Sequence, residues 1–319
     1  MRLACAGNAL FDIISFVDTD FASSIGVHGG STLHVGPEEL APIIAALRNT
    51  SSGAGGGAAN TARVFASLGF DAAFAGSIGK DETGKRYRSE MISSGVKGYL
   101  QEQELATGIF CAMIAPDGER TVVVSPGAAP LLRASAIPGS FYARNSTLYL
   151  DGFLAATEDT VLEIVRKAEA CGMGIALDVG GARLAASKRD FFNTLIRKSC
   201  AWTFMNEDEF MALAESGVDE ALMRYSSDVP GAVVVKRAET GAVSVSDGSI
   251  LESHVRPIQA TDTTGAGDAF AAGFLAAAFS GAQLARCLRL GNRIAEHAIQ
   301  VPGMSIDSVR LRHAAAGIL

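Results

Sequence analysis

The chain has 319 residues, of which 48% are hydrophobic and 35 are glycine, so it can bury a large core and turn often. Its formal net charge of −7 argues against a nucleic-acid partner, because such a partner requires a basic face. The five cysteines include no C-x-x-C pair and indicate a reduced, cytoplasmic protein. Apolar runs are too short for a signal peptide or a membrane span, so we expect one soluble α/β domain with an appendage.

The first third of the chain mixes short strands with helices. Asp12 lies in an apolar run just after the first expected strand. The glycine-rich stretch 51–57 is expected to be a flexible loop that leads into a helix at 58–68, with Asn60 in the first turn of that helix. The other elements expected here are strand 3–6, strand 31–35, helix 37–48, strand 71–78 and helix 82–93.

From residue 146 onward, strands and helices alternate regularly. This alternation predicts βαβ units and a parallel sheet with helices on both faces. The expected elements are strands 147–150, 173–178, 201–205 and 231–236, a β-rich piece at 242–258, and helices 158–170, 187–198, 206–214, 218–225, 266–280, 282–299 and 305–312.

The short β segments at 12–35 and 97–124 do not fit this alternation. We interpret them as a small separate sheet, discontinuous in sequence, that could cover a site on the main sheet. The domain prediction is therefore an α/β core made of 1–11, 36–96 and 125–319, with a β lid made of 12–35 and 97–124.

The segment 260–273 predicts a glycine turn that leads into a helix. The first amides of a helix lack internal partners and lie at the positive end of its dipole, so Gly265, Ala266 and Gly267 could stabilise a phosphate. Asp268 would repel that phosphate unless it accepts a proton from an attacking hydroxyl, which favours phosphoryl transfer with Asp268 as the base. An acidic first turn in an ordinary glycine-capped helix is the alternative.

A second polar cluster follows the expected strand 201–205. Parallel strands end where α/β proteins hold their ligands. Magnesium takes one or two carboxylates with waters and phosphate oxygens, so Asn206 and Glu209, one helical turn apart, could serve it together. A capped helix with an acidic first turn is the alternative here too.

Asp12 and Asn60 offer the acceptor and donor groups that hold vicinal sugar hydroxyls, although either could merely close a turn. Two phosphate-loop look-alikes are rejected. The stretch 79–85 has Walker A spacing, but Arg86 stands where a magnesium-holding Ser or Thr belongs, and 53–58 has dinucleotide-loop glycines without a preceding strand. The five histidines show no metal-ligand spacing.

Three motifs in a common order resemble the ribokinase, or PfkB, family of sugar and nucleoside kinases along essentially the whole chain. They are Gly56-Gly57-Ala58-Ala59-Asn60 through Gly69 to Gly79-x-Asp81-x-x-Gly84, then Asn206-x-x-Glu209, then Asp262-Thr-Thr-Gly-Ala-Gly-Asp268. The resemblance implies a ribokinase-like doubly wound α/β sheet covered by helices, with a small β-sheet lid. It also implies ATP and Mg²⁺ as cofactors and transfer of the γ-phosphate to a primary hydroxyl.

The resemblance also implies a role for each matching residue. Asp268 would be the base, and Gly265, Ala266 and Gly267 the anion hole, with Asp12, Gly57 and Asn60 as acceptor contacts. Asn206 and Glu209 would organise Mg²⁺ through water. Lys236 and Gly241 would contact the nucleotide. They lie on either side of Arg237-Ala238, a pair that is Leu-Gly in many members of the family. Asp262 and Thr264 match positions that hold a monovalent cation such as K⁺ in some relatives.

Within the family, three segments are more similar to adenosine kinases than to ribokinase itself: 7–13, 107–121 and 149–153. The expected acceptor is therefore an adenosine-like ribonucleoside, whose base would need an apolar slot. The candidate side chains for that slot are Phe16, Phe110 and Phe153.

Asp151 lies near the position of a substrate-binding acid in ribokinases, and this favours a free sugar instead. The alternative function is thus a fructokinase, ribokinase or keto-deoxy sugar acid kinase. A sugar or nucleotide sensor without turnover is the alternative outside the enzymes. The sequence leaves both the acceptor and the choice between monomer and homodimer open.

Overall fold

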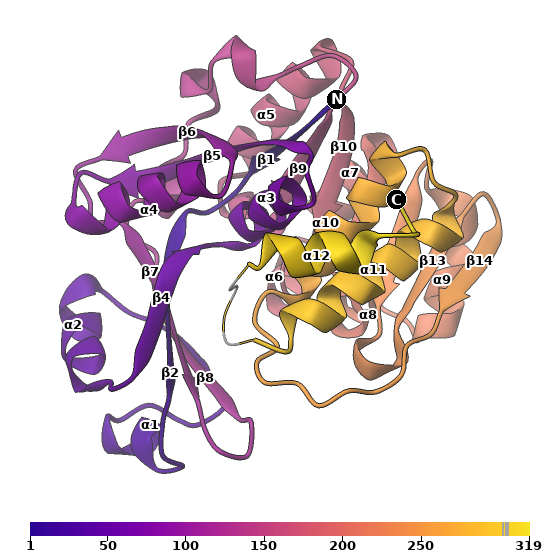
Figure 1. Ribbon diagram of the computed structural model, residues 1–319. Coiled ribbons are helices and arrows are strands. Elements are labelled where there is room, and N and C mark those ends of the chain that lie inside the picture. Colours follow the sequence, from indigo (N-terminus) through magenta and orange to yellow (C-terminus); the bar gives the residue numbers. More distant parts are fainter. Residues whose placement is uncertain (302, 304–305) are drawn as a thin grey trace.

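The computed structural model describes residues 1–301, 303 and 306–319. It has two sheets: a nine-stranded sheet with helices on both faces, and a five-stranded sheet that lies beside it (Figure 1). The strand order of the large sheet is β14-β13-β12-β11-β10-β9-β1-β5-β6, and its strands are parallel except for β13, which pairs antiparallel with both of its neighbours. The chain builds outward from β1 first on one side and then on the other, which confirms the predicted doubly wound arrangement.

The strands of the large sheet are short apolar runs, as expected for strands covered on both faces. They are β1 (Arg2–Ala6), β5 (Asp71–Gly79), β6 (Val96–Gln103), β9 (Thr147–Asp151), β10 (Gly174–Asp178), β11 (Cys200–Asn206), β12 (Ala232–Lys236), β13 (Ala242–Ser246) and β14 (Ser249–Ser253).

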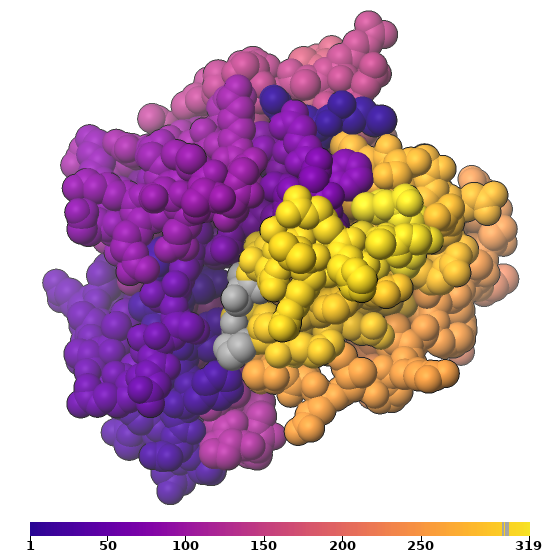
Figure 2. All heavy atoms as spheres, in the orientation of Figure 1, coloured from indigo at the N-terminus to yellow at the C-terminus, as the bar shows by residue number. Residues whose placement is uncertain are grey.

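One face of this sheet packs against helices from both halves of the chain: α3 (Gly57–Ser67), α4 (Glu82–Ser93), α10 (Ala266–Phe279), α11 (Leu284–Ala298) and α12 (Ser308–Ala315). α10 is apolar on all sides and is therefore almost wholly buried. Its Phe274 packs edge-on against Phe204 of β11. Figure 2 shows the yellow C-terminal helices directly beside the purple N-terminal half of the molecule. No helix within the described ranges is long and apolar enough to cross a membrane.

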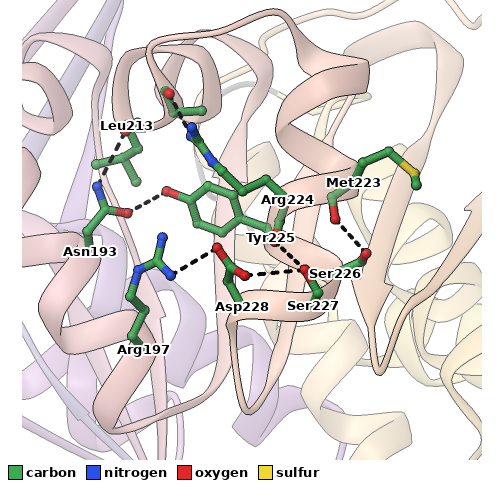
Figure 3. Close-up of polar contacts among 10 residues, drawn as sticks. Asn193, Arg197, Leu213, Met223, Arg224, Tyr225, Ser226, Ser227 and Asp228 are labelled. Atoms are coloured by element: carbon green, nitrogen blue, oxygen red, sulfur yellow. Dashed lines mark hydrogen bonds and ion pairs between the residues drawn. The ribbon is translucent and has the colours of Figure 1, made fainter.

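The opposite face packs against α5 (Glu158–Ala170), α6 (Ala182–Ser187), α7 (Arg189–Lys198), α8 (Glu207–Ala214) and α9 (Val218–Asp228). Side-chain hydrogen bonds join the last three of these helices (Figure 3). The Tyr225 hydroxyl donates to Asn193, whose amide donates to the carbonyl of Leu213. Arg197 pairs with Asp228 at 3.2 Å. This layer is structural and contains none of the predicted motif residues except those at the start of α8.

The small sheet has the order β3-β8-β7-β2-β4. Its strands are β2 (Leu10–Phe16), β3 (Thr32–His34), β4 (Thr50–Gly55), β7 (Gly108–Ile114) and β8 (Arg120–Ser125). The helices α1 (Phe21–Ser24) and α2 (Pro37–Ala46) lie on its outer side, where Leu40 and Ile43 pack against Cys111 and Met113. We call this sheet with α1 and α2 the lid.

Three stretches lie in a different place from the one that the sequence predicts. The expected loop 51–57 is largely strand β4, because its backbone pairs with β2 even though its side chains are small. The expected core segment 36–96 contributes α2 and β4 to the lid. The expected lid segment 97–124 begins too early, since β6 pairs with β5 in the large sheet along its whole length.

Candidate active site

The amino ends of α3 and α10 meet at Asp268. Gly265 caps α10 with a left-handed φ of 75°, which turns the chain into the helix and leaves Asp268 in the first turn. Asn60, in the first turn of α3, donates its amide to Asp268 Oδ2 at 3.0 Å. A Cβ on Gly57 would lie only 3.2 Å from Asp268 Oδ1, so the main chain of α3 comes close to the carboxylate. Residues from the first and third predicted motifs are therefore in contact.

Two cavities meet at this point. A small one of about 210 Å³ is lined by Asp268 together with Gly57, Asp151, Asp178, Glu209 and Lys236. A larger one of about 620 Å³ lies across the start of α10 and is lined by Gly241, Ile258, Ala266 and Phe270, among others. Both include Asn206, Lys236 and Gly267. A groove of about 850 Å³ between α5 and α7 is larger still, but the predicted motif residues do not line it.

Burial makes Asp268 a better proton acceptor. Loss of water raises the pKa of this carboxyl well above its usual range, and the nearby Asp178 carboxylate raises it further. The hydrogen bond from Asn60 and the charge of Lys236 act in the opposite direction. A carboxylate with a raised pKa and a fixed orientation has the properties of a general base.

Asn206 and Glu209 form a reciprocal cap at the start of α8. The backbone and side-chain amides of Asn206 donate to the Glu209 carboxylate at 2.8 and 3.0 Å, and the Glu209 amide donates back to Asn206 at 2.9 Å. Glu209 is buried and also lines the small cavity. Burial raises its pKa to about 7, against the opposing charge of Lys236. The helix-cap interpretation and the ligand interpretation therefore apply to the same two residues.

Lys236 ends β12 with its ammonium group over the start of α10. Its Nζ would lie 2.9 Å from a Cβ on Gly267, and it pairs with Asp178 Oδ2 at 2.9 Å. Asp178 is a site residue that the sequence analysis missed. It is the last residue of β10, directly beside Asp151 on β9, so the rule that parallel strands end at ligand sites could have identified it.

Asp151 is buried at the same sheet edge. Phe153 N donates to its Oδ1 at 3.0 Å, and the nearby amides of Asn8 and Ala58 lower the pKa of the carboxyl. Burial nevertheless raises its pKa to about 7. Of the candidate aromatic residues, Phe153 and Phe16 are both half exposed; Phe153 lines the small cavity, whereas Phe16 lies at the far end of β2.

Asp12 lies on the inner face of the lid, in register with Phe110 of β7. Burial raises its pKa to about 7, although Arg63 and Arg120 oppose the shift. The neighbouring Gly55 must be glycine, because a Cβ there would collide with the Asp12 carboxyl. The lid therefore presents one buried acid within an otherwise apolar face, which consists of Ile14, Phe110, Ala112, Ile114, Val122 and Val124.

The lid touches the turn before α10 through Arg120, a second residue that the sequence analysis missed. Its Nη1 donates to Thr264 Oγ1 at 3.1 Å. Thr264 in turn donates its amide and hydroxyl to Asp262 Oδ1 at 2.9 and 2.7 Å. The amide of Gly303 donates to Asp262 Oδ2 at 2.8 Å. Protein donors therefore already occupy both carboxylate oxygens of Asp262.

The sequence pattern of the pfkB family of carbohydrate kinases matches residues 34–310. The chain belongs to this family. It is 30% identical over 254 residues to an ATP-dependent ribose-1-phosphate kinase of Halopiger xanaduensis, an alignment that covers 78% of this chain and 81% of that protein.

Two solved structures share the whole fold with this pfkB-family chain. The adenosine kinase of Sinorhizobium meliloti superposes with a TM-score of 0.89 at 29% identity, covering 98% of each chain. A probable sugar kinase of Rhizobium etli superposes with a TM-score of 0.91 at 27% identity, covering 100% of this chain and 98% of that one. The predicted family, fold and enzyme class are confirmed: the protein is a nucleoside or sugar kinase, with an alcohol as acceptor and ATP as substrate.

Proposed function

We propose that this kinase transfers the γ-phosphate of ATP to the primary hydroxyl of an adenosine-like ribonucleoside. The observation that supports this best is the contact between Asn60 and Asp268 beside the start of α10, which joins an acceptor contact to a base and an anion hole. The second support is the lid face around Asp12, which offers one carboxylate for ribose hydroxyls and an apolar surface for a base.

A free sugar is the second candidate acceptor, and Asp151 is the residue that favours it. Asp151 lines the small cavity, as a sugar-binding acid would. However, the Phe153 amide already donates to one oxygen of its carboxylate and the amides of Asn8 and Ala58 lie nearby, which leaves Asp151 less able to accept bonds from a ligand. This occupancy is our reason for placing the nucleoside first.

In the proposed reaction, Asp268 accepts the proton of the attacking hydroxyl while Asn60 holds its carboxylate in position. The amides of Gly265 and Gly267 stabilise the charge on the transferred group, and Lys236 adds a positive charge beside them. The Ala266 amide, the third of the predicted anion hole, donates to the Thr263 carbonyl at 3.2 Å and would have to be shared with that group. The lid excludes water from the site, and Arg120 brings a further positive charge to the turn.

Magnesium and the nucleotide fit the remaining residues. One buried carboxylate and one amide, Glu209 and Asn206, border the cavity shared with Lys236. Asn206 donates to both Glu209 oxygens, so the pair would hold Mg²⁺ through water, with phosphate oxygens completing the set. When bound with ATP, the ion neutralises phosphate charge. The nucleotide would occupy the larger cavity, in which Gly241 turns the chain with a φ of 108°.

A monovalent cation fits less well. The side chains of Asp262 and Thr264 are already joined to each other, to Gly303 and to Arg120, so we derive no step through K⁺. The proposal includes a cytoplasmic location, consistent with the free thiols of all five cysteines.

The acceptor is tested by thermal unfolding of the protein with a panel of nucleosides and sugars, combined with an ATP-consumption assay. A ligand at one hundred times its Kd adds about 2.7 kcal/mol to the free energy of unfolding, so the true acceptor is expected to raise the Tm clearly. Adenosine should raise the Tm and be phosphorylated. A shift with fructose, ribose or a keto-deoxy sugar acid, and none with adenosine, would replace the nucleoside with a sugar.

Glu209→Gln is expected to raise the Mg²⁺ concentration needed for half-maximal activity, while the KM for the acceptor stays close to that of the parent. The amide keeps the helix cap through its remaining oxygen but loses the charge that faces the metal and phosphates. Asp190→Asn, in the acidic first turn of α7, is the matched control. If the magnesium titrations of Glu209→Gln and the parent coincide, the acidic turn is only a helix cap.

A further inference from the structure

Three side chains of the core hold the end of the lid strand β4. Arg63 of α3 donates to the carbonyl of Ala54, and Glu90 of α4 accepts from the amide of Ala54 at 2.6 Å. Tyr87 of α4 donates its hydroxyl to the carbonyl of Gly55 at 2.9 Å. We call Arg63, Tyr87 and Glu90 the clamp. It grips β4 where this strand rises from the lid toward α3 (Figure 1).

The clamp satisfies backbone groups that strand pairing leaves free. β4 is the edge strand of the lid, with β2 as its partner on one side. The amide and carbonyl of Ala54 both point to the other side, where the clamp supplies an acceptor from Glu90 and a donor from Arg63. Both side chains are charged, so the hydrogen bonds of Glu90 and Arg63 to Ala54 are charge-assisted.

The clamped residues also determine where Asp12 lies. Asp12 pairs with Gly53 of β4, and the Asp12 carboxyl packs directly over Gly55. The next residue, Gly56, has a φ of 92°, and a Cβ there would collide with the carbonyl of Asn8. After this turn the chain enters α3 at Gly57, so the clamp fixes the short connection between Asp12 and the contact of Gly57 with Asp268.

Arg63 has a second, electrostatic link to Asp12. The charged groups that act on Asp12 are Arg63 from α3, Arg120 from β8 and Asp262 from the turn before α10. The two arginines favour the ionised carboxylate, whereas burial and Asp262 oppose it. Arg63 is the larger of the two favourable influences, so its loss would leave Asp12 protonated at a higher pH.

We propose that Arg63 and Glu90 are positioning residues for acceptor binding: through the end of β4 they hold Asp12 in place on the inner face of the lid. This inference rests on the proposed function, in which Asp12 contacts the acceptor. It adds two residues of the core that do not line the cavities described above and to which the sequence analysis gave no role.

Kinetics with the acceptor that the panel identifies test the proposal. In Arg63→Gln and Glu90→Gln, the KM for the acceptor should rise about tenfold, the size of one charge-assisted hydrogen bond, while the KM for ATP stays within about twofold. Arg63→Gln should also move the acidic limb of kcat/KM for the acceptor to higher pH. Arg63→Lys, which keeps the charge, should leave that limb near its parental position.

The matched control is Arg88→Gln. Arg88 lies on α4 like Glu90, but it forms an exposed ion pair with Glu102 at 2.7 Å. A rise of both KM values together, or the same change in Arg88→Gln, would show that the clamp only supports the fold and would overturn the proposal.

Amide hydrogen exchange without substrates separates this inference from the proposed function. Exchange in 50–55 and 10–16 should be faster in Arg63→Gln and Glu90→Gln than in the parent, with no change in Arg88→Gln. Unchanged exchange in these strands would refute the positioning role of the clamp even if the proposed function is correct. A parent that phosphorylates neither nucleosides nor sugars would refute the proposed function, and the exchange result would then decide the clamp alone.

Discussion

Replacing Asp268 with asparagine is expected to lower kcat by about three powers of ten or more, because the attacking hydroxyl loses its base. Asn60 and the anion hole remain in Asp268→Asn, so binding of ATP and acceptor should change little. The measurement is steady-state kinetics together with the Kd of each substrate. A kcat within about tenfold of the parent would remove Asp268 from the proton transfer.

The same substitution should leave the protein as stable as the parent, or more stable, at neutral pH. The folded pKa of Asp268 lies well above its unfolded value, so the folded state binds this proton more tightly. The ionised group therefore lowers stability progressively as pH rises from the unfolded pKa through the folded one. Asparagine removes this cost, and the Tm of Asp268→Asn at pH 7.5 should equal or exceed that of the parent. A large drop in Tm would mean that the lost activity reflects unfolding.

Asp12→Asn is expected to lower kcat/KM for the acceptor by about 10- to 100-fold with little change in the KM for ATP, since hydrogen bonds to a charged group are lost on one side of the reaction only. Asn fits the space over Gly55 that Asp12 fills. Asp18→Asn, an exposed acid of the lid, is the matched control. Equal losses for both substrates would place Asp12 outside the acceptor site.

The pH dependence gives a further check on Asp12. Its pKa is raised to about 7, so kcat/KM of the parent for the acceptor should rise as pH passes through 7, and the part of this rise that Asp12 causes, as distinct from Asp268, should be absent in Asp12→Asn. Ionisation also costs the folded state stability between the unfolded pKa and about 7. Asp12→Asn should therefore be at least as stable as the parent at pH 8, and the two should differ least at low pH. A parental acceptor profile that stays flat between pH 6 and 8 would contradict this assignment.

The regular second half of the fold could be predicted from periodicity, because each buried strand from β9 to β12 is a short apolar run next to an amphipathic helix. The lid was harder. β4 consists of small residues, and only its pairing with β2, whose residues lie 35 to 45 positions earlier in the chain, makes it a strand. Such non-local pairing overrides local propensity, so the sequence indicates a loop instead.

The residues of the site also divide into those that can be predicted from the sequence and those that cannot. Residues in glycine-rich or capping patterns, such as Asn60, Glu209 and Asp268, can be found in the sequence because the pattern itself has a physical meaning. Asp178, Arg120 and Arg63 have no such pattern. Their importance comes from what lies opposite them in space: Lys236, Thr264 and Ala54 respectively. Side chains of this kind become visible only when distant segments are placed together.

The contact between Asn60 and Asp268 joins residues 208 positions apart, and this has a consequence for synthesis on the ribosome. The lid strands and β1, β5 and β6 all precede residue 126, whereas α10, which covers α3, begins at residue 266. The nascent chain therefore carries the apolar side of α3 uncovered until α10 has been synthesised. Uncovered apolar surface of this kind makes a folding intermediate prone to aggregation. We expect chains stopped before α10 to bind chaperones strongly, and this binding to fall once α10 covers α3.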